Sequence, residues 1–192
     1  MRLREAIDSA FSALKQEAVD MQDSADGDRA GLQVVSALAE GADRMVAEAG
    51  LAHGAALVVV LPFPHAIYLQ DFPEAQSKQD FTRLLETAAE VVELDGHTAS
   101  DESRNAAYSA VGEAVVARSD VIFTLWDGCP ANGPGGTGEI VDYARHHGRP
   151  VLWFKLDHDG GAAAEPSLLL AQQTIESGAV AALLAHLKGA RS

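Results

Sequence analysis

The chain has 192 residues and a formal net charge of −14, with 47% apolar and 22% charged residues. This length allows a sizeable core in one domain, so we predict a single domain over residues 1–192. The excess of negative charge repels nucleic-acid backbones and anionic membranes, so we expect neither duplex nucleic acid nor a membrane as a partner.

The cysteine content and the hydropathy pattern predict a cytoplasmic protein. Cys129 is the single cysteine, so no disulfide can form within the chain, which suits a reducing compartment. Its position in a Gly/Pro-rich loop gives little reason to expect chemistry at the thiol. The first residues have an amphipathic pattern and not the apolar core of a signal peptide. The longest apolar run, residues 55–63, is too short to span a bilayer.

The first half of the chain alternates between predicted helices and strands. Apolar residues recur at helical spacing from Leu3 to Met21, which predicts an opening helix with one buried face. A short buried strand over 32–35 is followed by a helix over 41–53. The continuous apolar run Ala56–Leu61 predicts a strand covered on both faces. We expect an aromatic loop over 65–73.

The second half continues the alternation and predicts a Rossmann-like α/β fold. We expect helices over 75–89, 102–118 and 137–147, and strands over 91–94, 120–126 and 151–154, the strand over 91–94 lying near an edge. One or two helices are expected over 167–187. Such alternation is typical of a three-layer sandwich with a mainly parallel sheet of about five strands and helices on both faces. The core would span residues 32–155, with a C-terminal helical segment over 167–188.

A glycine-rich loop over 133–139 is the strongest functional signal. It lies between a predicted strand and a predicted helix, where Gly135, Gly136 and Gly138 let the backbone approach a ligand closely. The N–H groups at the helix start and the helix dipole favour an anion there, and Thr137 can cap the helix or donate to a phosphate oxygen. The loop has neither the Walker pattern nor the dinucleotide fingerprint. We predict a nucleotide-like phosphate site. The alternative is a flexible connector with an ordinary cap.

A second helix start, over residues 36–44, follows the strand at 32–35. Ser36, Gly41 and the free N–H groups could hold a phosphate, with Arg44 as a bidentate donor. Asp43 is an acceptor that could hold ribose hydroxyls, as could Glu40. The alternative is a capped helix whose acidic first turn complements the dipole.

A third segment, residues 61–72, is dense in aromatic side chains and includes the candidate ligand contact Pro62. Such a loop could stack a base or act as a lid. The alternative, which we favour for Phe72, is that Phe63 and Phe72 pin the loop to the core.

Glu139 is the candidate catalytic carboxylate. Beside a bound sugar phosphate it could stabilise an oxocarbenium-like centre, attack it or activate water. The alternative is a first-turn glutamate that complements the helix dipole. The histidines show no metal-ligand spacing, so we expect neither a metal nor a cofactor.

Together these segments resemble the SLOG superfamily, which unites the DNA-processing protein A domain with the Lonely Guy phosphoribohydrolases. The resemblance spans residues 32–154. The family's Ser-Gly-x-Ala-x-Gly-x-Asp helix start is similar to Ser36-Ala37-Leu38-Ala39-Glu40-Gly41-Ala42-Asp43. The Lonely Guy Pro-Gly-Gly-x-Gly-Thr-x-x-Glu loop is similar to Pro134-Gly135-Gly136-Thr137-Gly138-Glu139. The resemblance implies a nucleotide-derived small molecule as the ligand of the two loops, and a homodimer, because relatives form them.

The resemblance leaves two functions open. Some family members sense a nucleotide, often within bacterial conflict systems, and others cleave the base from a nucleoside monophosphate. The Lonely Guy spacing places its glutamate at Asp142, and an alignment on Thr137 puts Glu139 one residue early. Residues 136–144 and 148–151 are also similar to nucleoside deoxyribosyltransferases, which use a glutamate nucleophile. Glu139 lies one position away from that glutamate as well. We therefore expect nucleotide binding or sensing, with an N-glycosidic enzyme that uses Glu139 as the alternative. A domain that binds nothing is the third possibility.

Overall fold

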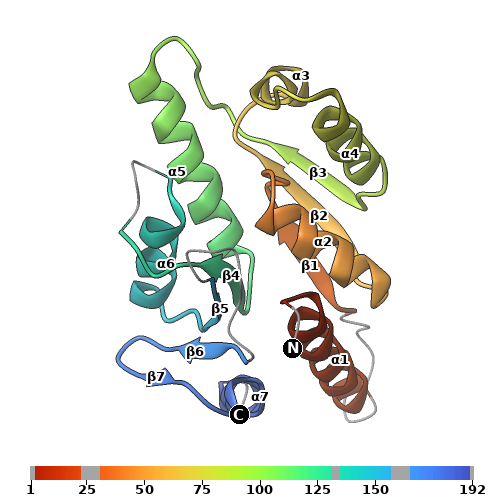
Figure 1. The fold of residues 1–192 in the computed structure, drawn as a ribbon, viewed down its shortest axis with the longest axis vertical. Helices are drawn as coiled ribbons and strands as arrows, with labels where there is room; N and C mark the ends of the chain where they lie inside the picture. The colour runs from red at the N-terminus through yellow and green to blue at the C-terminus, as the bar shows by residue number, and fades with distance from the viewer. Residues whose placement is uncertain (1–2, 23–30, 131–134, 157–164, 191–192) are drawn as a thin grey trace.

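The computed structural model describes residues 3–22, 31–130, 135–156 and 165–190. Over these residues the chain is an α/β protein with seven α-helices, one short 3₁₀-helix (η1) and seven strands in two sheets (Figure 1). The elements in chain order are α1 (Leu3–Gln22), β1 (Gln33–Ser36), α2 (Ala42–Ala52), β2 (Ala56–Leu61), α3 (His65–Tyr68), η1 (Leu69–Asp71), α4 (Ala75–Glu86), β3 (Glu90–Glu93), α5 (Asp101–Ala117), β4 (Ile122–Trp126), α6 (Thr137–His146), β5 (Val151–Lys155), β6 (Ser167–Leu169), β7 (Thr174–Ile175) and α7 (Ala179–Gly189).

The first sheet is parallel and has the order β1-β2-β3. Its central strand β2 is almost entirely buried because both neighbours and helices cover it, as its unbroken apolar run predicts. The predicted edge position of β3 is confirmed, and the side chain of Val91 on this strand is 42% exposed. Figure 1 shows α2 and α4 on one side of this sheet and α5 on the other. The three strands therefore end at one common edge, which carries the loops after β1 and β2.

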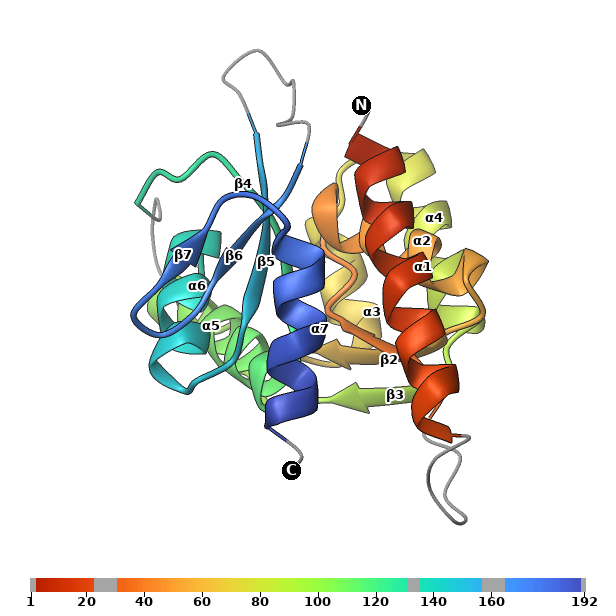
Figure 2. The same ribbon diagram turned by 90° about the horizontal axis from the view of Figure 1, so that it is seen from below.

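The second sheet is mixed and has the order β4-β5-β6-β7. β4 and β5 are parallel, whereas β6 and β7 pair antiparallel. Figure 2 shows α5 and α6 on one side of this sheet and α1 and α7 on the other. Each face is apolar: Ile122 and Val151 pack with Val141 of α6, and Leu152 packs in the larger core that includes Leu183 of α7. This sheet therefore has the layered arrangement predicted for the whole domain.

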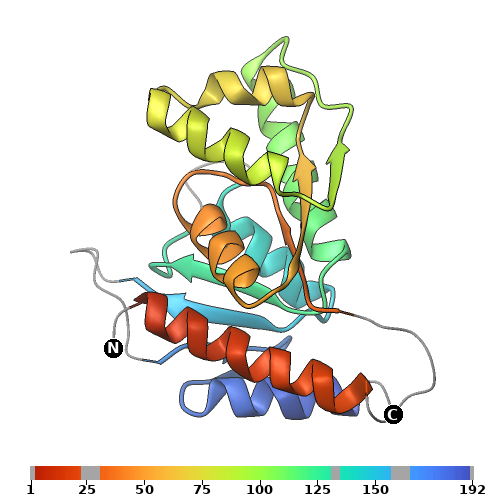
Figure 3. The same cartoon turned by 90° about the vertical axis from the view of Figure 1, so that its right-hand side faces the viewer.

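The prediction of a single sheet of about five mainly parallel strands is wrong. Two separate sheets are present in the described chain, and Figure 3 shows β4 and β5 running across the direction of β2 and β3. Side-chain packing joins the sheets: the ring of Phe11 from α1 lies 5.1 Å from the ring of Phe123 in β4. On its other side Phe11 approaches Gly50 of α2, which packs closely on Val34 of β1. One continuous apolar core still spans both sheets.

Two predicted local structures also need correction. Within the segment 65–73, expected as a loop, residues 65–71 form α3 and η1, and the carbonyl of Pro64 accepts hydrogen bonds from the N–H groups of Ile67 and Tyr68 at the start of α3. The predicted helix or helices over 167–187 are in fact two short strands and α7. Here Leu168 and Leu169 continue the sheet, since both pair with β5 and both are buried.

A close backbone approach holds the loop after β3 against the loop after β2. The N–H of Gly96 donates a hydrogen bond of 3.1 Å to the carbonyl of Pro62. A Cβ at position 96 would lie 2.2 Å from that carbonyl oxygen and 2.6 Å from the Cβ of Ala107 in α5. Only glycine fits this position. No helix in the described part of the chain is long and apolar enough to cross a membrane.

Candidate functional site

The β4–α6 loop contains the predicted anion site, and the structure describes it from Gly135 onward. Gly133 and Pro134 lie outside the described residues. Gly136 is the N-cap of α6, and no side chain of the described residues caps the helix there. Thr137 is the first helical residue, so it does not serve as the cap. In the first turn of α6, Thr137 is exposed, whereas Gly138 is buried.

Glu139 accepts hydrogen bonds from two donors among the described residues. The N–H of Gly135 donates to Oε2 at 2.9 Å, and the Ser109 hydroxyl donates to Oε1 at 3.1 Å. The carboxylate thus closes the loop before α6 and ties it to α5. This geometry fits the alternative to catalysis, in which Glu139 is a first-turn acid that complements the helix dipole. The residue is nevertheless exposed.

Gly135 lies directly against α5. Its φ of 77° is in the left-handed region, and a Cβ there would lie 2.8 Å from the Cβ of Tyr108 and 3.1 Å from the backbone nitrogen of Ser109. Both the conformation and the contact require glycine. The glycine that the sequence suggested for contact with a ligand therefore also seats the loop on a helix.

The start of α2 has its own hydrogen bonds. Ser36 is the last residue of β1, and its hydroxyl accepts from the N–H of Leu38 at 3.0 Å and donates to Asp43 at 3.4 Å. The N–H of Ala39 also donates to the Asp43 carboxylate, at 3.3 Å. Burial raises the pKa of Asp43 above its usual value. The acidic first turn thus holds the loop, and the exposed N-cap Gly41 has no side-chain cap.

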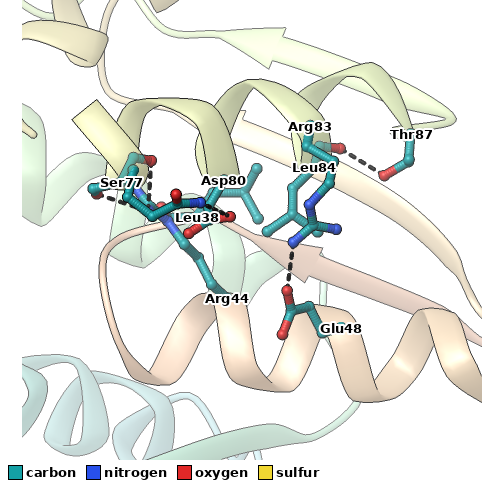
Figure 4. A network of polar contacts seen from close by, with 9 residues as sticks. Leu38, Arg44, Glu48, Ser77, Asp80, Arg83, Leu84 and Thr87 are labelled. Atoms are coloured by element: carbon teal, nitrogen blue, oxygen red, sulfur yellow. Dashed lines mark hydrogen bonds and ion pairs between the residues drawn. The ribbon is translucent and has the colours of Figure 1, made fainter. Parts of the chain in front are cut away.

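Arg44 is 8% exposed and binds the protein itself (Figure 4). Its Nε donates to the carbonyl of Leu38 at 2.9 Å, and one terminal nitrogen donates to the carbonyl and the hydroxyl of Ser77 in α4, each at 2.9 Å. The guanidinium lies 4.4 Å over the ring of Phe72. Its other terminal nitrogen is buried without a hydrogen-bond partner among the described residues. Glu40, the other acceptor at this helix start, receives a hydrogen bond from the Ser77 hydroxyl.

The aromatic segment after β2 is part of the core. Phe63 is fully buried and Phe72 is 4% exposed, so the prediction that Phe72 pins the loop is confirmed. Pro62 is also buried, and its carbonyl is taken by Gly96. Tyr68 packs edge-on against Phe63 and Phe72, at 6.0 Å and 5.1 Å between ring centroids. Burial and the charge of Asp43 raise the pKa of Tyr68, so its hydroxyl stays protonated.

A chain of ring contacts links the two predicted loops. The guanidinium of Arg44 lies over the ring of Phe72, and Tyr68 packs edge-on between Phe72 and Phe63. Phe63 in turn lies 5.7 Å from Tyr108, which contacts Gly135. The starts of α2 and α6 are therefore connected through packed side chains. Two hollows on the described surface lie elsewhere, one along α4 and one between α1 and α7.

Three residues of this region were not singled out by the sequence: Arg104, Tyr108 and Ser109, all on α5. Asp71, which the aromatic segment contained without a role, pairs with Arg104 and accepts a hydrogen bond from Tyr108. Arg104 and Tyr108 are four residues apart and so share a helix face. That spacing is visible in the sequence, but their partner is more than thirty residues away.

Comparison with known proteins provides no family assignment. No protein-family model matches the chain, and no match to a curated protein was found.

Proposed function

We propose that this chain binds or senses a nucleotide or a nucleotide-derived small molecule, as a Rossmann-like domain of the SLOG type. The observation that carries the proposal is the start of α6. A glycine N-cap follows the largely buried strand β4 along the chain, and the exposed residue Thr137 comes directly after the cap. Backbone N–H groups and the helix dipole at such a start favour a phosphate.

The two helix starts are suited to different parts of the ligand. At α6 we assign the phosphate to the backbone of Gly136, Thr137 and Gly138. At α2 we assign the ribose hydroxyls to the acceptor oxygens of Glu40 and Asp43. Arg44 supports the proposal indirectly, because it fixes the loop carbonyl at Leu38.

The test adds a negative charge at the proposed phosphate site. Thr137→Glu places a carboxylate at the first residue of α6, where it repels a phosphate. Ala75→Glu is the matched control, because Ala75 is the exposed first residue of α4. Adenosine, guanosine, cytidine and uridine monophosphates are added, and the melting temperature is followed. A ligand that binds only the native state raises the melting temperature, because it adds about 2.7 kcal/mol to the free energy of unfolding at a hundredfold excess over Kd.

We expect at least one nucleotide to raise the melting temperature of the wild type and of Ala75→Glu. Thr137→Glu should lose that rise while keeping its ligand-free melting temperature. If none of the four nucleotides shifts the wild type, the proposal is wrong. An unchanged rise in Thr137→Glu would move the phosphate away from α6.

An N-glycosidic enzyme is the second proposal, and the exposed carboxylate of Glu139 at the same helix start is the observation in its favour. Its two hydrogen bonds to Gly135 and Ser109 weigh against a free nucleophile. Glu139→Gln keeps the acceptor for Gly135 but removes the charge. Free base released from the four nucleoside monophosphates is measured by chromatography, and release that does not exceed the level of Glu139→Gln rejects the enzyme.

A further inference from the structure

A polar network joins α5 to the short helix η1 after β2. Arg104 forms an ion pair with Asp71, and the Tyr108 hydroxyl donates to the other carboxylate oxygen of Asp71. Arg104 Nε donates to the Tyr108 hydroxyl at 3.2 Å. The side chain of Asp71 is 18% exposed and that of Arg104 is 31% exposed, so solvent screens this network less than a surface pair. Each of the three side chains contacts the other two.

The same stretch of α5 carries the loop before α6. Tyr108 is the residue against which Gly135 packs, and Ser109 donates to Glu139. Glu139 in turn accepts from the N–H of Gly135. The position of the α6 start therefore depends on the position of Tyr108 and Ser109.

The network connects parts of the chain that belong to different sheets. Asp71 follows β2 in the first sheet, whereas Gly135 follows β4 in the second. Strand pairing in the described chain does not connect the two sheets, so their relative position depends on packing and on contacts such as these. Arg104 also lies 5.3 Å over the ring of Phe63, at the end of β2. Asp71 thus holds α5 at Arg104 and Tyr108, next to the residues of α5 that contact the loop before α6.

We propose that Asp71, Arg104 and Tyr108 are positioning residues, which hold the start of α6 at the place needed to bind the phosphate of a nucleotide. This inference rests on the proposed function. None of the three side chains needs to touch the ligand. Loss of the Tyr108 hydroxyl leaves Asp71 with one donor fewer, and α5 can shift relative to η1. The start of α6, which Tyr108 and Ser109 hold in place, can then move, and the affinity for the phosphate falls.

The experiment compares Tyr108→Phe with Tyr143→Phe in the full chain. Both variants remove one hydroxyl and keep the ring, and Tyr143 lies on α6 with its ring stacked on His147 at the far end of the helix. Dissociation constants for the four nucleoside monophosphates and for ribose 5-phosphate are measured by calorimetry. Hydrogen exchange of residues 135–140 is measured without ligand.

We expect Tyr108→Phe to raise Kd about tenfold, the factor expected when about one hydrogen bond no longer supports the site, and Tyr143→Phe to leave Kd within about twofold. Exchange at residues 135–140 should rise in Tyr108→Phe while exchange in β5 stays unchanged. A purely structural role would lower the melting temperature without this selective change in Kd. If Tyr108→Phe does not fold, Arg104→Lys provides the same comparison, because lysine keeps the charge and loses the donor to Tyr108.

The outcomes separate the two proposals. A wild type that binds none of the probes refutes the proposed function, and the positioning role with it. A wild type that binds, together with Tyr108→Phe of equal affinity and unchanged exchange, refutes the positioning role alone. Selective weakening in Tyr108→Phe supports both.

Discussion

Arg44 holds α2 against α4, and its replacement tests whether this buried cation is a structural clamp. In Arg44→Met the carbonyl of Leu38 and both the carbonyl and the hydroxyl of Ser77 lose donors that lie at 2.9 Å. Each lost hydrogen bond from a charged group costs about 1.5–3 kcal/mol. Methionine retains apolar contact with Phe72, and removing a buried charge offsets part of the loss, so we expect a net cost of about 3 kcal/mol.

The neighbouring Arg83 supplies the matched control on the same pair of helices. Arg83 pairs with Glu48 of α2 at 2.5 Å, but its side chain is 53% exposed (Figure 4). A pair of this kind contributes about 0–1 kcal/mol, so Arg83→Met should change stability little. Urea unfolding of the ligand-free proteins gives both free energies, and Arg44→Met should also melt about 6–12 °C lower. Equal losses in the two variants would refute the clamp.

Two further predictions concern residues outside this clamp. Gly96→Ala should cost at least about 2 kcal/mol, because its Cβ would lie 2.2 Å from the Pro62 carbonyl oxygen, whereas Gly31→Ala, with open space around it, should change urea unfolding little. Cys129 is exposed, and the hydrogen bond and charge of Asp127 raise the pKa of its thiol. Less thiolate is then present near pH 8, so Asp127→Asn should speed alkylation by iodoacetamide there, and the two rates should converge at a pH above both pKa values. Equal rates at pH 8 would contradict this role of Asp127.

Local patterns were sufficient to predict most of the elements in residues 32–154. The apolar run at 56–61 coincides with β2, because a strand buried on both faces needs no alternation. The predicted helix over 137–147 ends within one residue of α6, where His146 and His147 bond to carbonyls of the last turns. These signals work because each depends on neighbouring residues alone.

Contacts between distant residues could not be read from such patterns. The division into two sheets is set by which strands pair, and the ring of Phe11 packs on Phe123, a residue far away in the chain. Leu168 and Leu169 have apolar character that suits a helix or a strand equally, and pairing with β5 decides for the strand.

The sequence predicted the two helix starts of the candidate site but not the partners of their side chains. Arg44 was expected to face a phosphate, and it faces Leu38 and Ser77, the latter 33 residues away. Glu139 was read as a catalytic group or a first-turn acid, and its donors include Ser109, 30 residues away. Which reading holds depends on tertiary contacts, so a motif alone cannot decide between a ligand contact and a loop anchor.

The two-sheet arrangement also has a consequence for cooperativity. Backbone pairing makes each sheet a natural unit of local opening, whereas the described strands of one sheet share no ladder with those of the other. The two units can therefore open with different free energies while the common apolar core keeps them in one domain. A small molecule bound to the starts of both α2 and α6 would link the two units and bring their free energies of opening closer together. Ligand binding would then reduce the local opening of both sheets without any change in the conformation of the protein.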